Sequence, residues 1–225
     1  MADKTRRDDD CTPEARVAKS LFGYGVLAGP FYVLASVIQG LLTPGFNFAR
    51  DSWSVLSLGG AGWVHIVVFI LTGLFVVAAA VAFSRHLTPG EGHRAWVFLG
   101  IYGLLLIVAG ISLPDATGAS FTLHGTLHLA AGGLGFIGFS VATFVVARRF
   151  FRTSARGWAW STLAAGILLL VGFIGLASGK PTACTVLLFT VTVILSWTWL
   201  LLVSLKFYKE ADVIGRRDAA ALKSP

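Results

Sequence analysis

Six long apolar segments divide the chain, and all of its 18 basic and 11 acidic side chains lie between or outside them. Placing a charge in the hydrocarbon core of a bilayer is costly, so this partition predicts lipid as the surrounding medium. The six segments cover residues 20–42, 62–83, 95–113, 125–147, 157–178 and 183–205.

The length of the segments predicts helices. Each is close to the ~20 residues that an α-helix needs to cross ~30 Å of hydrocarbon. The short alternating segments of an outer-membrane barrel do not occur. We therefore expect an all-α integral membrane protein with a six-helix transmembrane domain over residues 20–205. A polar segment (1–19) precedes this domain, and a basic tail (206–225) follows it.

The basic residues predict the orientation. Sixteen of the 18 precede the first segment, follow the sixth, or lie between segments two and three or four and five. Only Arg50 and Lys180 lie on the other side. Cytoplasmic loops carry the excess of Lys and Arg, so both termini are expected in the cytoplasm and the protein in the plasma membrane. The same placement accounts for the net charge of +7. Membrane lipids are thus expected as partners, and nucleic acid is not.

Small residues indicate where helices approach closely, because lipid does not drive helices together hydrophobically. Gly100, Gly103 and Gly110 predict a tight contact along the third segment. The fourth segment contains even more small residues, and we expect its helix at the centre of the bundle. Its small residues are Gly125, Ala130, Ala131, Gly132, Gly133, Gly135 and Gly138.

Two further local predictions follow. Pro30 should bend the first helix, with Ser36 available for the carbonyl group that proline leaves unpaired. Trp197 and Trp199 are expected near the cytoplasmic interface, where tryptophan rings suit the headgroup region.

Polar residues gather at one predicted depth, the outer ends of the segments. Tyr32, Ser36 and Gln39 share one helical face there. The loop after the first segment should form a short helix over residues 52–58, capped by Asp51 or Ser52. We predict a polar cavity lined by Gln39, Arg50, Asp51, Ser54, His65, Asp115, His124 and His128.

The histidines leave three interpretations open. In the first they are structural and bond a loop carboxylate. In the second, His65, His124, His128 and Asp115 hold a divalent metal such as Zn²⁺, which activates water. The spacing of His124 and His128 places both on one side of a helix but is common.

The third interpretation is a pocket for a lipid headgroup or another small polar ligand, with Arg50 and Lys180 facing its phosphate or carboxylate. Arg50 and Asp51 can pair with each other at the surface, and a more specific hypothesis pairs Arg50 with Asp115 as a lid over the histidines. Phosphate-binding loops, G-x-S-x-G turns and lysines inside a span are absent from the sequence.

Several motifs together resemble a known family. They are the "GP" in the first span, "RDSWSVLSLGGAGW" before the second, an aspartate after the third and "HGTLH" at the fourth. This pattern is similar to the bacterial six-span membrane protein family catalogued as domain of unknown function 998. The resemblance runs from about residue 20 to 205 and implies a six-helix membrane protein with no established activity. The matching positions are Arg50, Asp51, Ser54, Leu56, Gly59, Trp63, Asp115, His124 and His128.

The sequence assigns no catalytic residue, no established cofactor and no oligomeric state. Binding of a small polar ligand, lipid headgroup or metal ion in the outer cavity is the favoured hypothesis. A membrane-embedded metal hydrolase acting on lipid is the alternative. A structural or interaction subunit without a ligand is the third.

Overall fold

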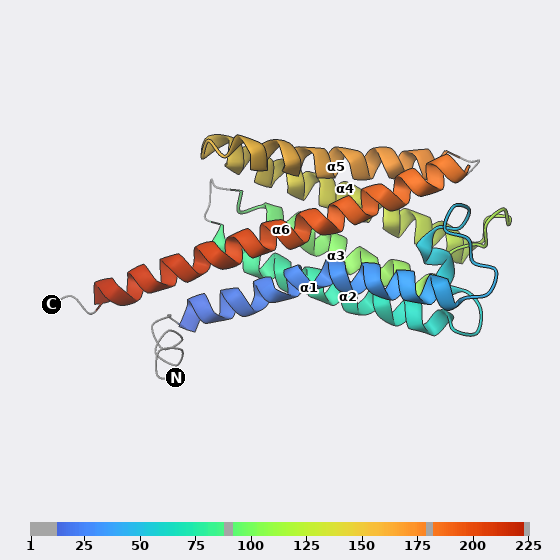
Figure 1. Ribbon diagram of the computed structural model, residues 1–225, viewed down its shortest axis with the longest axis horizontal. Helices are drawn as coiled ribbons and strands as arrows, with labels where there is room; N and C mark the ends of the chain where they lie inside the picture. The colour runs from blue at the N-terminus through green and yellow to red at the C-terminus, as the bar shows by residue number, and fades with distance from the viewer. Residues whose placement is uncertain (1–12, 88–91, 179–181, 223–225) are drawn as a thin grey trace.

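The computed structural model describes residues 13–87, 92–178 and 182–222, which form six α-helices and one short 3₁₀ helix, with no strand (Figure 1). The elements are α1 (Pro13–Leu42), η1 (Trp53–Ser57), α2 (Gly62–His86), α3 (Ala95–Ile111), α4 (Leu123–Arg152), α5 (Arg156–Ala177) and α6 (Ala183–Leu222). The predicted all-helical class is confirmed.

Five of the described helices are long and apolar enough to cross a membrane. Their apolar parts are Arg16–Leu42, Gly62–His86, Leu123–Arg152, Arg156–Ala177 and Ala183–Ala211. The sixth, α3, is apolar but has only 17 residues. At 1.5 Å per residue α3 is about 26 Å long, close to the lower limit for a span.

The helices pack as a closed ring in chain order. Each helix contacts the next one in sequence, and α6 packs back against α1. In Figure 1 the helices run roughly along one axis, with the start of α1 and the end of α6 at the same end of the molecule. We call the opposite end, which carries the connections 43–61 and 112–122, the loop end. The predicted central position of the fourth helix is wrong, because α4 is one ring member between α3 and α5.

Glycines let α2 and α3 approach closely, as the third segment predicted. A Cβ atom added to Gly103 would lie 2.8 Å from the Gly73 carbonyl oxygen and 2.9 Å from Val77. One added to Gly110 would lie 2.6 Å from the Cβ of Phe69. Backbone contact at these positions is what holds apolar helices together in lipid.

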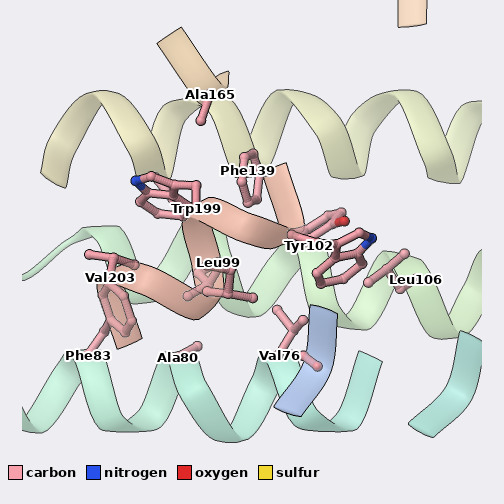
Figure 2. Close-up of a cluster of buried hydrophobic side chains, with 14 of the residues drawn as sticks. Val76, Ala80, Phe83, Leu99, Tyr102, Leu106, Phe139, Ala165, Trp199 and Val203 are labelled. Carbon is pink, nitrogen blue, oxygen red and sulfur yellow. The ribbon is translucent and has the colours of Figure 1, made fainter. Parts of the chain in front are cut away.

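Aromatic side chains fill the middle of the ring (Figure 2). The ring of Tyr102 lies 5.2 Å from that of Phe139, and Phe139 lies 5.2 Å from Trp199. The indole N–H of Trp199 donates to the Thr162 hydroxyl at 2.9 Å. Trp197 and Trp199 are thus core residues, and their predicted interfacial position is wrong. Because α6 continues well past residue 205, both tryptophans lie in mid-helix. Their side chains face the interior of the ring.

An ionic cluster closes the end that carries the termini. The Glu210 carboxylate lies 2.8 Å from the Lys206 ammonium group, 3.2 Å from His86 Nε2 and 3.7 Å from the Arg149 guanidinium. The cluster joins α6 to α2 and α4. Directly beside it, the rings of Phe22, Phe83 and Phe207 pack within 6.0 Å of one another. This end of the ring is therefore filled.

Two details of α1 and η1 differ from expectation. A short helix does follow Ser52, but the Ser52 side chain makes no capping hydrogen bond and its hydroxyl lies 3.1 Å from that of Ser54. Ser36 donates to the Tyr32 carbonyl at 2.7 Å and not to the carbonyl of Val26, which Pro30 leaves unpaired. In both cases a local side-chain contact replaces the predicted partner.

Candidate functional site

Asp51 fixes the first connection of the loop end. Its carboxylate accepts from Arg50 Nη2 at 2.9 Å, Arg50 Nε at 3.1 Å and the Asn47 backbone N–H at 3.0 Å. The Thr117 hydroxyl of the second connection also donates to it, at 3.0 Å. The carboxylate side chain is only 7% exposed, while Arg50 is 62% exposed. Asp51 therefore joins the two connections from a buried position.

The environment of Asp51 favours the charged form. Burial raises the pKa of this carboxyl group, but the hydrogen bonds from Arg50, Asn47 and Thr117 and the nearby guanidinium charge together outweigh it. The pKa of Asp51 consequently lies below its usual range. The hypothesis that Arg50 pairs with Asp115 as a lid is wrong, because Arg50 Nε and Nη2 both donate to the carboxylate of the adjacent Asp51.

Thr122, at the start of α4, positions the Asp115 carboxylate. Its two oxygens accept from the Thr122 hydroxyl at 2.7 Å and the Thr122 backbone N–H at 3.0 Å. Thr122 is itself the N-cap of α4 and accepts from the Gly125 N–H. These hydrogen bonds from Thr122, with the nearby His128, lower the pKa of Asp115. A carboxylate at a helix N-terminus is also favoured by the helix dipole.

Gln39 and His65 form a buried polar pair behind η1. The Gln39 side-chain N–H groups donate to the Leu56 and Ala61 carbonyls at 3.0 and 3.2 Å. Its Oε1 is then the acceptor for His65 Nδ1, 3.2 Å away. A neutral His65 ring therefore carries its hydrogen on Nδ1 and leaves Nε2 as an acceptor, which has no hydrogen-bond partner among the described residues. This pair holds the start of α2 to α1.

His128 has a defined hydrogen-bonding state. Its Nδ1 lies 2.7 Å from the Ala109 carbonyl oxygen and 2.9 Å from that of Ser112. Both partners are acceptors, so Nδ1 must donate, and in the neutral ring Nε2 keeps its lone pair. The residue lines a cavity at the loop end, where this lone pair can serve as a base, an acceptor or a metal ligand.

The cavity has a volume of about 420 Å³ and lies between the two connections and the loop-end halves of α3 to α6. Arg50, Ser54, Asp115, Thr117 and His128 supply its polar lining near the connections. Aromatic and aliphatic side chains of the helices supply the rest. The cavity thus combines a polar part with a larger apolar part, as small-molecule sites in proteins do.

Two tyrosines lie in the apolar part. Tyr32 and Tyr102 line the cavity. The centre of the Trp197 ring lies 5.3 Å from that of Tyr32 and 5.9 Å from that of Tyr102. Both tyrosines are at most 7% exposed. Across the described side chains, neither hydroxyl is recorded in a hydrogen bond, although buried Tyr hydroxyls usually have a partner. These two groups can anchor a ligand deep in the cavity.

The predicted site residues fall into four groups. Arg50, Ser54, Asp115 and His128 line the cavity. Gln39, Asp51 and His65 are buried beside it and position its walls. His124 is exposed and is not part of the lining. Lys180 lies outside the described residues.

The metal hypothesis has partial geometric support. His128 presents a lone pair, but within the described ranges no three His, Cys, Asp or Glu side chains lie close enough to hold a metal ion. Asp115 is already engaged by Thr122. Metal binding therefore stays a prediction.

Sequence reasoning did not find the aromatic lining. Tyr102 carries no motif, Trp53 lies within the quoted motif but was not assigned to the site, and Trp197 was expected at the interface. The one available signal was the helical face shared by Tyr32, Ser36 and Gln39, all three of which are buried as expected.

The fold and the cavity together define the class: the chain is a multi-pass membrane protein with a ligand-sized cavity at one end of a helical ring. Residues 26–206 match the family described as "Protein of unknown function (DUF998)". The match covers most of the chain, and the protein belongs to this family. No curated protein and no solved structure matched the chain.

Proposed function

We propose that the chain crosses the plasma membrane six times, with both termini in the cytoplasm. The strongly asymmetric distribution of Lys and Arg supports this orientation. The position of α3 in the ring supports counting it as a span, because it packs between α2 and α4 although it has only 17 residues. In this topology the loop end faces outward.

We further propose that the loop-end cavity binds a small ligand with a polar group, such as a lipid headgroup. The observation that carries the proposal is a cavity of about 420 Å³ with a charged rim and two buried tyrosine hydroxyls. In a structural or interaction subunit without a ligand, such a space would be expected to close by packing, because each unfilled volume in a protein interior costs stability.

Thermal stabilisation of the purified protein tests this proposal. Glycerophosphocholine, glycerophosphoglycerol, inorganic phosphate and glycine betaine are the probes, and the melting temperature is the readout. At least one probe should raise it saturably, and Arg50→Gln or Tyr102→Phe should weaken that effect. If no probe stabilises the protein and a protein partner co-purifies instead, the interaction-subunit alternative is favoured.

The second candidate function is a metal-dependent hydrolase acting on lipid. The specific observation in its favour is the fixed Nδ1 donor of His128, which presents Nε2 to the cavity as metal-binding histidines do. Elemental analysis of protein purified without chelators tests it, with His128→Ala and His124→Ala beside the unmodified chain. Bound zinc that is lost in His128→Ala supports this function, and absence of metal from every preparation rejects it.

A further inference from the structure

The two walls of the cavity differ in chemistry. The Arg, Asp and His side chains of its lining, Arg50, Asp115 and His128, come from α4 and the two connections. The other wall is formed by α5 and α6, and Thr190 is its one hydroxyl-bearing residue. This second wall comprises Phe173, Leu176, Ala177, Phe189, Thr190, Val193 and Trp197. Polar and apolar surfaces thus face each other across one space.

The second wall is held to the rest of the ring below the cavity. Trp197 packs against Gly29 of α1, where an added Cβ would come within 2.9 Å of it. Phe173 packs equally closely against Gly133 of α4. In Figure 1, α6 and α1 converge toward the end of the molecule where α1 begins and diverge toward the loop end, where α6 lies beside α5. Between these loop-end halves lies the cavity.

The polar wall has unused hydrogen-bonding capacity at its rim. Arg50 uses Nε and Nη2 for Asp51 and the Gly45 carbonyl. Its Nη1 has no recorded hydrogen bond within the described part of the chain, and the residue lines the cavity. Guanidinium groups favour phosphate because their N–H groups match its oxygens.

We propose that the ligand is a phospholipid with a single hydrocarbon chain, whose chain lies against α5 and α6 and whose phosphate meets Arg50. This inference rests on the proposed function and specifies its ligand class. The chain would lie along Phe173, Phe189 and Val193 of the apolar wall. The headgroup would lie between the two connections, beside Asp115 and Thr117.

The volume favours one chain over two. The cavity volume of about 420 Å³ lies in the lower part of the range for small-molecule pockets, which favours a ligand with one chain over one with two. The apolar wall in turn excludes a purely polar solute as the best ligand, because such a solute would leave the wall facing water.

Photolabelling of the full chain in phosphatidylcholine nanodiscs tests the inference. The probe is a lysophosphatidylcholine with a photoreactive diazirine in its chain, and the competitor is unlabelled palmitoyl lysophosphatidylcholine. We expect labelling of Phe173, Phe189 or Val193 that the competitor suppresses. Labelling of lipid-facing residues such as Ile174 and Val191, which are 64% and 51% exposed, should persist.

A pair of glycine variants localises the binding. Gly132 lines the cavity, and a Cβ added there meets nothing within 4 Å, so Gly132→Leu fills the cavity without a backbone clash. It should lower the affinity for the lysophospholipid about tenfold or more. A Cβ added at Gly23 of α1 likewise meets nothing within 4 Å, and Gly23 is not part of the lining, so Gly23→Leu is the matched control and should leave affinity unchanged.

The outcomes separate this inference from the proposed function. Suppressible labelling of the cavity wall that Gly132→Leu abolishes supports both. Labelling restricted to lipid-facing residues, with stabilisation by glycerophosphocholine or phosphate that depends on Arg50, overturns the single-chain ligand and leaves the proposed function standing. No suppressible labelling and no stabilisation by any probe overturns both. Suppressible labelling that Gly132→Leu does not change overturns the cavity as its location.

Discussion

Thr117 donates a hydrogen bond to Asp51 at 3.0 Å, and this contact joins two connections that are 66 residues apart in the sequence. Asp51 is buried and also holds Arg50 and the Asn47 backbone, whereas Thr117 is on the exposed side of the contact. Residues of both connections line the cavity, so this pair ties the two sides of its rim together.

Removing the Thr117 hydroxyl should loosen the rim without unfolding the protein. In Thr117→Val, Asp51 keeps its bonds to Arg50 and Asn47, and we expect faster amide hydrogen exchange over residues 112–122 with a melting temperature almost unchanged. Asp51→Asn should be more severe, because a hydrogen bond to a charged group contributes about 1.5–3 kcal/mol. Equal exchange rates in Thr117→Val and the unmodified protein would contradict the proposed link.

The same contact predicts a pH dependence. Because the folded-state pKa of Asp51 is lowered, its stabilising contribution is complete above the ordinary carboxyl pKa of about 3.9 and is lost as pH falls through the lower folded-state value. The difference in melting temperature between the unmodified protein and Asp51→Asn should therefore be constant from about pH 8 to 5 and shrink only below about pH 4. A difference that already disappears near pH 6 would contradict this assignment.

The close approach of α2 and α3 predicts different effects of two alanine substitutions. In Gly103→Ala the new methyl group would meet the Gly73 carbonyl oxygen at 2.8 Å and should cost about 1–3 kcal/mol. In Gly100→Ala the nearest atom is the Cβ of Ala80 at 3.8 Å, an ordinary contact, so this control should be neutral or slightly stabilising. Thermal unfolding in one detergent measures both, and equal melting temperatures would argue against the contact.

The hydrogen bond between Trp199 and Thr162 should matter for stability. Thr162→Val leaves a buried indole N–H without an acceptor, and we expect a loss of about 0.5–2 kcal/mol. Thr198→Val removes a hydroxyl that bonds only within its own helix on an exposed face, and should have little effect. Chemical unfolding of both variants, followed by tryptophan fluorescence, makes the comparison.

The proposed orientation predicts which cysteines react from outside the cell. Cys11 and Cys184 are first replaced by serine, and single cysteines are then placed at Gly118 and Thr153. A membrane-impermeant maleimide should label the cysteine at 118 in intact cells and the one at 153 only after lysis. The reverse pattern would invert the topology.

The sequence predicted the helices well and the site in part, for identifiable physical reasons. Exclusion of charge from hydrocarbon leaves a strong signal in the sequence, so the helical class and the apolar segments were predictable. Close backbone contact at Gly103 was predictable because lipid leaves few other ways to join helices. The helix order around the ring was not, since no sequence pattern states that α6 returns to α1.

The depth of individual side chains was the weaker part. Trp197 and Trp199 were expected at the interface because the end of α6 cannot be located from hydropathy alone. Arg50 was linked to Asp115 because both are charged residues of the loop end, yet a neighbour in the chain reaches the guanidinium more easily. The Gln39–His65 contact joins residues 26 apart and depends on how α1 and α2 meet, which single-sequence patterns do not specify.

Ring closure by α6 has a consequence for biogenesis. Gly29 on α1 packs against Trp197, and Gly25 meets Ser204, so α1 has no final neighbour on that side until α6 is inserted. Assembly intermediates that lack α6 would expose this seam to lipid or to the translocon. The cavity would thus form only after α6 has joined the other five helices.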